Sequence, residues 1–109
     1  MLLTKGAMLL VSIEPIELEG YMFTAVTVHL PKTTLLTISN EIGYIMCGAL
    51  DVQLLNTRLA DRKIIAGRAV GVKTIEDLLK APLESVTTEA EKLGIVKGMT
   101  GEEALLKMI

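Results

Sequence analysis

Short runs of β-branched and aromatic residues, separated by turn residues, occupy the first half of the chain. Four of these runs have the length and apolar content of strands: 12–18, 21–30, 33–38 and 43–47. Turn-forming residues lie between them, at Gly20, Pro31 and Asn40. The segment 21–30 is apolar on both faces, which indicates a central strand covered on both sides. Because the connections are short, we expect an antiparallel meander.

A helical period follows in the middle of the chain. Asp51 is a residue type that caps the N-terminus of a helix. Three apolar residues then recur on one helical face: Val52, Leu55 and Leu59. This pattern predicts a helix over 51–61. The segment 63–72 is apolar and strand-like again, although Gly67 and Arg68 interrupt it, and we expect a strand there.

Three threonines in the last third of the chain each precede an acidic residue at the spacing of a capping box. The pairs are Thr74 with Asp77, Thr88 with Glu91, and Thr100 with Glu103. Helices are therefore predicted at about 75–80, 88–93 and 101–108. Strands first and helices last indicate an α+β fold, with a mainly antiparallel sheet of about five strands and helices packed on one face.

We expect residues 1–8 to be a disordered leader and residues 9–109 to form a single α+β domain. Half of the residues are hydrophobic, and the mean hydropathy of +0.50 is high for a chain without a membrane segment. The longest uncharged apolar stretch, 42–50, is too short to cross a bilayer. Excess apolar surface on a small domain is typical of a subunit interface or a binding groove, and we expect a homo-oligomer.

The charges exclude two classes of partner. Eleven Lys and Arg and thirteen Asp and Glu give a net charge of −2, spread along the chain. Nucleic acids and anionic membrane surfaces are both bound by clustered basic residues, so we expect neither partner. The single cysteine, Cys47, excludes an internal disulfide and favours a reducing, cytoplasmic compartment. The sequence contains no motif for a metal ion or a cofactor.

Cys47 and His29 are the candidate catalytic residues. Cys47 lies at the end of a predicted strand and before a predicted helix, where backbone amides would stabilise a thiolate. Alternatively it is a small buried hydrophobic residue, as free cysteines commonly are. His29 is the only histidine, and histidine is the residue type best suited to be a general base near neutral pH. The alternative for His29 is a local hydrogen bond at the end of a strand.

Arg68, Lys32 and Asp51 are the candidate ligand-binding residues. Arg68 lies in an apolar strand pattern, where a guanidinium needs a partner. That partner is either a small anionic ligand or a carboxylate, from Asp51, Asp61 or a neighbouring subunit. Lys32 adds a positive charge beside the strand that contains His29, and Asp51 is either a helix cap or part of a site.

Three runs resemble a known family. They are HLPKTT at 29–34, GYIMCGALDV at 43–52 and DRKIIAGRAVGV at 61–72, the last continued by TIEDLL at 74–79. On these runs the chain resembles the YunC-like proteins, small bacterial and archaeal proteins known chiefly as a domain of unknown function. The resemblance extends over 12–109 and implies a single intracellular domain of bacterial or archaeal type. It implies no activity, ligand or catalytic residue.

Two functions follow from these residues. The first is a small cytoplasmic oligomeric module for binding or regulation, because no complete catalytic set is present. The second is an enzyme in which Cys47 is the nucleophile, His29 the base and Arg68 the residue that binds an anionic substrate. A cavity holding all three side chains would favour the enzyme, and a Cys47 packed among aliphatic side chains would favour the module.

Overall fold

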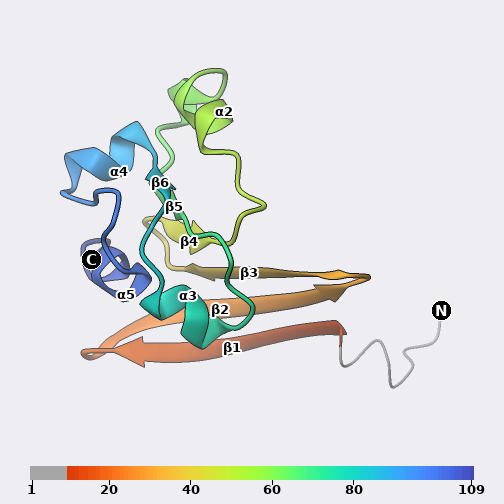
Figure 1. Ribbon diagram of the computed structural model, residues 1–109. Helices are drawn as coiled ribbons and strands as arrows, with labels where there is room; N and C mark the ends of the chain where they lie inside the picture. Colours follow the sequence, from red (N-terminus) through yellow and green to blue (C-terminus); the bar gives the residue numbers. More distant parts are fainter. Residues whose placement is uncertain (1–9) are drawn as a thin grey trace.

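The computed structural model describes residues 10–109, and its centre is a six-stranded sheet (Figure 1). The strands follow one another across the sheet in chain order: β1 (Val11–Leu18), β2 (Tyr21–Leu30), β3 (Thr33–Ser39), β4 (Tyr44–Met46), β5 (Ala66–Arg68) and β6 (Ser85–Val86). The helical segments of the described residues are α2 (Val52–Asn56), the 3-10 turn η1 (Ala60–Arg62), α3 (Ile75–Lys80), α4 (Thr88–Lys92) and α5 (Gly101–Leu105). All strand pairs are antiparallel except β4 with β5. The predicted α+β fold is confirmed, with six strands instead of about five.

Two tight turns connect the long strands. Leu18 pairs with Tyr21 and Leu30 pairs with Thr33, so each turn has two central residues. Gly20 has a φ of 89°, a left-handed conformation that glycine adopts without a steric penalty. These pairings confirm the antiparallel meander that the short connections predict.

The hydrophobic core lies on one face of the sheet. Side chains alternate across a strand, and the buried ones are Phe23 and Ala25 on β2, Leu36 and Ile38 on β3, and Ile45 on β4. Helix α3 contacts β2 and β3, and helix α5 contacts β4. These helices bring Leu78 and Leu105 into the same cluster, so the face is closed by two short amphipathic helices.

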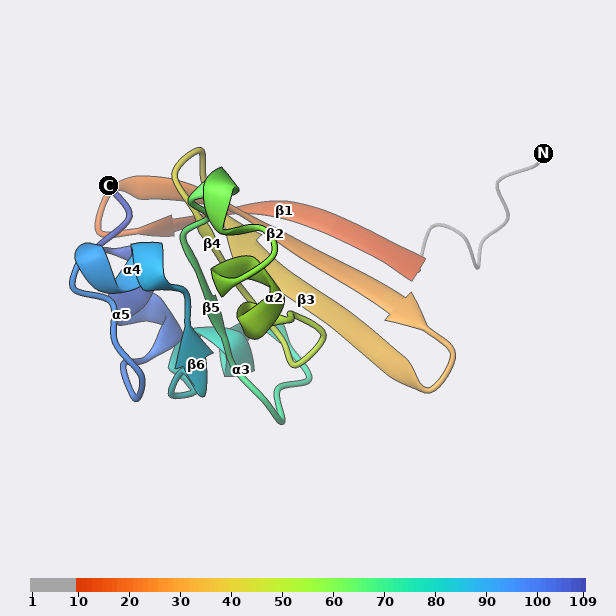
Figure 2. The same cartoon turned by 90° about the horizontal axis from the view of Figure 1, so that it is seen from above.

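The β1–β3 meander is longer than the helices that cover it. In Figure 2 its β2–β3 end extends away from the helices and from the short strands β4 to β6. We call this end, residues 11–14, 26–30 and 33–35, the arm. Its residues are exposed or half-buried. The buried side chains of β2 and β3 that share the core cluster with Leu78 of α3 lie toward the other end of the meander.

Two predicted elements are much shorter in the structure. The helix predicted over 51–61 ends at Asn56, where the Thr57 hydroxyl donates to the carbonyl of Gln53 (2.8 Å) and the chain continues as η1. The strand predicted over 63–72 contains only β5, since these are the residues that pair with β4. The predicted segments 43–47 and 101–108 are trimmed in the same way, to β4 and α5.

The sequence also missed one strand and misplaced one helix cap. Strand β6 has two residues, too few to form a pattern. The first and third predicted capping boxes are confirmed in α3 and α5, but α4 is capped by Thr87 and not by Thr88. The buried Thr87 hydroxyl accepts hydrogen bonds from the N–H groups of Ala66 (3.1 Å) and Ala90 (3.2 Å). This contact with β5 decides which threonine caps the helix.

The leader predicted over 1–8 lies outside the residues that the structure describes. The bounds predicted for the domain begin at residue 9, which the structure does not describe either. None of the described helices is long and apolar enough to cross a membrane.

Candidate functional site

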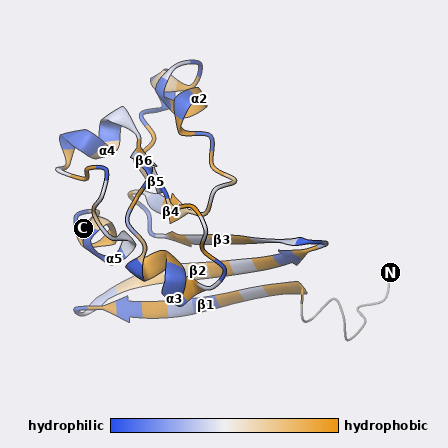
Figure 3. Ribbon diagram, viewed as in Figure 1, coloured by the Kyte–Doolittle hydropathy of each residue, from blue (hydrophilic) through white to orange (hydrophobic). Residues whose placement is uncertain are grey.

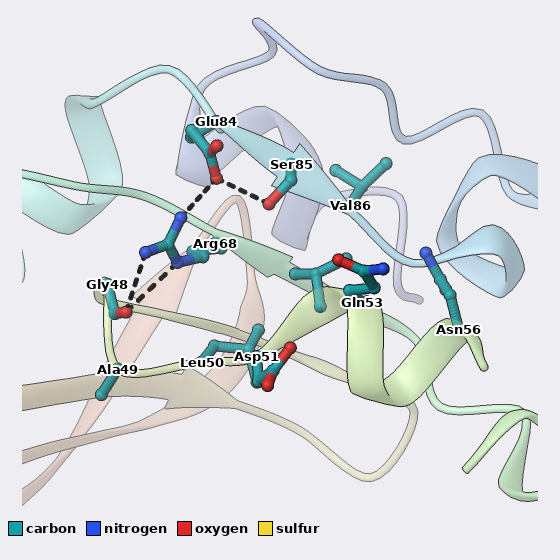
Figure 4. A pocket seen from close by; sticks show the side chains of 11 residues that line it. Gly48, Ala49, Leu50, Asp51, Gln53, Asn56, Arg68, Glu84, Ser85 and Val86 are labelled. Carbon is teal, nitrogen blue, oxygen red and sulfur yellow. Dashed lines mark hydrogen bonds and ion pairs between the residues drawn. The ribbon is translucent and has the colours of Figure 1, made fainter. Parts of the chain in front are cut away.

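An open pocket of about 670 Å³ lies where the β4–α2 loop approaches β5 and β6 (Figure 4). Its lining is drawn from three parts of the chain: Gly48, Ala49, Leu50, Asp51, Val52, Gln53 and Asn56, then Arg68, then Glu84, Ser85 and Val86. Polar side chains from a loop, a helix and two strands therefore meet in one place. Arg68 and Asp51 are the two candidate site residues that the structure brings together here.

The Arg68 side chain is held between two hydrogen-bond partners, the carbonyl group of Gly48 and the carboxylate of Glu84. Its Nε and Nη2 donate to the carbonyl oxygen of Gly48, at 3.2 and 3.1 Å. Its Nη1 donates to Oε1 of Glu84 at 2.7 Å, which is also an ion pair. The carboxylate partner is therefore Glu84, whereas the sequence suggested Asp51, Asp61 or another subunit.

Arg68 retains hydrogen-bonding capacity. A guanidinium has five N–H donors, and the described residues accept three hydrogen bonds from Arg68. Its side chain is 29% exposed, so the remaining donors are partly open to solvent. Because these three hydrogen bonds already fix the conformation of the side chain, little further rotamer freedom is lost when an oxyanion binds to it.

Glu84 is held as a carboxylate. The Ser85 hydroxyl donates to its Oε1 at 2.7 Å, and this bond is the main reason that the pKa of Glu84 lies below its ordinary value. The hydrogen bond from Arg68 lowers the pKa further. The pocket therefore keeps an ion pair on its rim at neutral pH.

Removing the Ser85 hydroxyl is expected to raise the pKa of Glu84 toward its ordinary value. The bond from Arg68 remains in Ser85→Ala, so the shift is partial. A carboxyl group with a lowered folded pKa stabilises the fold above its unfolded pKa, and the contribution is lost as the pH falls through the folded value. The carboxyl carbon of Glu84, followed by NMR against pH, measures this pKa. Ser12→Ala on β1 is the control, and an unchanged midpoint in Ser85→Ala would contradict the assignment.

Cys47 packs at the edge of the core. The residue is 6% exposed, and its sulfur accepts a hydrogen bond from the N–H of Leu36 at 3.5 Å. It also lies 3.9 Å from the carbonyl oxygen of Thr34. Helix α2 begins only at Val52, and Asp51 caps it by accepting from the N–H of Leu54 at 3.0 Å. The thiol is therefore not at the end of that helix, and a nucleophilic role would require it to become accessible.

Iodoacetamide is expected to label Cys47 much more slowly in native buffer at neutral pH than in denaturant. The reason is its burial against β3, because alkylation needs an accessible thiolate. An exposed thiol in the same loop, made as Cys47→Ala with Ala49→Cys, is the control and should react in native buffer. Equal native and denatured rates for Cys47, after correction for the thiolate fraction, would contradict burial.

His29 lies on the arm and Lys32 in the β2–β3 turn at its end, and both are outside the lining of the pocket. Both are exposed, and Nδ1 of His29 lies 3.5 Å from the hydroxyl of Thr34. Among residues 10–109 no hydrogen bond joins Cys47 to His29. The structure thus does not gather Cys47, His29 and Arg68 in one cavity. Within the same described part of the chain no three His, Cys, Asp or Glu residues cluster as metal ligands would.

Four polar residues of the pocket were not foreseen: Gln53, Asn56, Glu84 and Ser85. Asn56 also links two helices, because its Oδ1 accepts from the N–H of Thr88 at 2.8 Å. The requirement of Arg68 for a carboxylate was a usable signal for Glu84. It did not identify the partner, since that choice depends on the position of β6 in the sheet.

Comparison with known proteins identifies relatives over nearly the whole chain. The family described as a domain of unknown function, DUF1805, matches residues 46–108, which include the whole lining of the pocket. The uncharacterized protein YunC of Bacillus subtilis (strain 168) is 64% identical over 100 residues, covering 92% of this chain and 99% of YunC. The crystal structure of TA1206, a protein of unknown function from Thermoplasma acidophilum, is similar with a TM-score of 0.82 and 32% identity, over 91% of this chain and 93% of TA1206. The chain therefore belongs to the YunC-like family, and it contains the DUF1805 domain.

Proposed function

We propose that this protein is a small binding or regulatory module whose ligand occupies the Arg68 pocket. The observation that supports this most strongly is the guanidinium itself, which is anchored by the Gly48 carbonyl and by Glu84 and still has donors to offer. A preorganised arginine in a polar pocket is typical of sites that bind carboxylate or phosphate groups. The candidate thiol is buried instead, which favours a binding role over a cysteine-dependent enzyme.

The charges of the residues that line the pocket restrict the class of ligand that can bind there. Arg68 supplies one positive charge, while Asp51 and Glu84 supply two negative charges. A simple anion would meet a net negative rim, so the ligand needs hydrogen-bond donors or an amine beside its anionic group. The side-chain amides of Gln53 and Asn56 are uncharged hydrogen-bond donors and acceptors for the same ligand. A small zwitterion with a carboxylate therefore fits better than phosphate alone.

Titration of the isotope-labelled protein with L-glutamate, acetate and inorganic phosphate tests this proposal. We expect saturable shifts of the Gly48, Gln53 and Ser85 amide signals with glutamate, and weaker ones with acetate or phosphate. Arg68→Gln should abolish them, whereas Arg58→Gln, a charge change at an exposed site, should leave them intact. The absence of any saturable shift at these amides, or the same shifts in Arg68→Gln, would refute the proposal.

We also propose that the protein is cytoplasmic and self-associates. The mean hydropathy of +0.50 and the many exposed large hydrophobic side chains support self-association. Sedimentation at micromolar concentration should give a dimer or a larger species. A clean monomer near 11.8 kDa would rule it out.

A further inference from the structure

The two faces of the arm differ sharply in polarity. One face carries polar residues: Ser12, Glu14, Thr27, His29 and Thr34. The opposite face carries the aliphatic residues Val11, Ile13, Val26, Val28, Leu30 and Leu35, with Thr33 as its polar residue. We call this second set the apolar arm face. Apolar positions recur along β1 and β2 in Figure 3, and the strand pairings place those of one face side by side.

The apolar arm face is open within the described residues. Ile13 is 68% exposed and Val11 is 48% exposed, while Val26, Val28 and Leu35 on the inner strands are half-buried. The helices α3 and α5 lie on the other side of the sheet, against the core residues Ile38 and Ile45. An exposed group of large aliphatic side chains on one face of a sheet is typical of a surface that another chain covers.

We infer that the apolar arm face packs against the same face of a second copy of this chain. Two sheets stack face to face about 10 Å apart, with their side chains interdigitated. A two-fold axis through the arm would place aliphatic side chains against their own equivalents. The polar face of each arm, with His29, would stay in water. The inference rests on the self-association proposed above and is independent of the ligand.

Charge and area both favour a second copy as the occupant. The apolar arm face contains no charged residue, so it offers nothing by which a charged partner would be recognised. The side of the meander on which this face lies spans about 26 Å along the eight residues of β1 and about 14 Å across β1, β2 and β3. A specific dimer buries roughly 800 Å² per partner. Because a surface covered with side chains exposes more area than its outline, this whole side of the meander supplies the larger part of that requirement. The interface therefore extends from the apolar arm face, which covers about half of this length, toward the exposed Met22 and the charged Glu17 at the other end.

The strand register also links this face to the pocket. Ile13 pairs with Val26, Val26 with Thr37, Thr37 with Met46, and Met46 with Arg68. Directly paired residues point to the same side of a sheet. The apolar arm face and Arg68 therefore lie on one side of the sheet, with Ile13 about 19 Å from Arg68 across four strand spacings. A partner seated on the arm would lie on the side where the pocket opens.

A charge placed on either face of β1 tests the inference. Ile13→Lys and Val11→Lys put lysine on the apolar arm face, whereas Ser12→Lys puts the same charge on the polar face of the same strand. We expect sedimentation to give a dimer for the full chain and for Ser12→Lys. The two apolar-face variants should dissociate at least about 100-fold more readily, since like charges would meet in the interface. The three substituted residues are exposed, and circular dichroism checks that each variant folds.

The outcomes of this experiment separate the proposed self-association from the interface inferred at the apolar arm face. A monomeric full chain would overturn self-association and this interface together. A dimer that survives both Ile13→Lys and Val11→Lys would overturn the interface and leave self-association standing. Dissociation by Ser12→Lys as readily as by Ile13→Lys would point to pairing along the free edge of β1 instead, and would also overturn stacking of the faces.

Discussion

Gly101→Ala is expected to lower the free energy of unfolding by about 3 kcal/mol, at the upper end of the range for overpacked cores. Gly101 is the first residue of α5, and it is buried where α5 crosses α3 and β4. A β-carbon at this position would overlap the carbonyl oxygen of Leu78 and lie 2.7 Å from Cδ1 of Ile45. The backbone of α3 cannot move aside as a flexible side chain would. The two helices must therefore separate, and the core that they close must loosen.

Gly48→Ala is the matched control for this experiment. A β-carbon at Gly48 would meet Val70 and Arg68 at 3.6 and 3.7 Å, which are ordinary van der Waals distances. The same chemical change should therefore alter stability by less than about 0.5 kcal/mol, as surface substitutions commonly do. Urea unfolding followed by circular dichroism measures both variants. Equal stabilities for the two alanine variants would show that α3 and α5 do not approach as closely as the structure has them.

Thr87→Val is expected to destabilise the fold by about 2–4 kcal/mol, since it leaves two buried N–H groups without an acceptor. The substitution keeps the shape of the side chain and removes only the hydroxyl. That hydroxyl accepts from Ala66 on β5 and from Ala90 in α4. Thr87 itself is 1% exposed, so water cannot replace the lost partner.

The neighbouring Thr88→Val supplies the control. Thr88 is exposed, and it was the cap that the spacing of the sequence suggested. Thermal or urea unfolding should find Thr88→Val close to the parent and Thr87→Val far below it. If Thr88→Val were the more damaging change, the capping box at Thr88 and Glu91 would be correct after all and the placement of Thr87 against β5 would be wrong.

The long strands and the capped helices could be predicted because their causes are local. Runs of β-branched, aromatic and apolar residues identify β1, β2 and β3, and the short turns between them restrict the pairing to an antiparallel meander. A capping box joins residues three apart, so Thr74 and Thr100 were recognisable without any knowledge of the fold. The family resemblance was also carried by contiguous runs of residues and is confirmed by the relatives.

The short strands could not be predicted because they have almost no pattern of their own. β5 has three residues and β6 has two, and each is a strand only because its neighbours supply hydrogen-bond partners. For the same reason the extent of the predicted strand 63–72 was wrong. Thr87 caps α4 in place of Thr88 because its hydroxyl also reaches β5, an element distant in the sequence.

By itself the sequence determined the fold class, the long meander, two helix caps, the need of Arg68 for a partner and the membership of a family. Only the tertiary structure decided that this partner is Glu84, that Arg68 and Asp51 share a pocket, and that Cys47 is buried while His29 lies apart on the arm. The physical reason is the range of the interactions. Turns, caps and periodicity act within a few residues, whereas a site is formed by side chains that strand pairing brings together from distant segments.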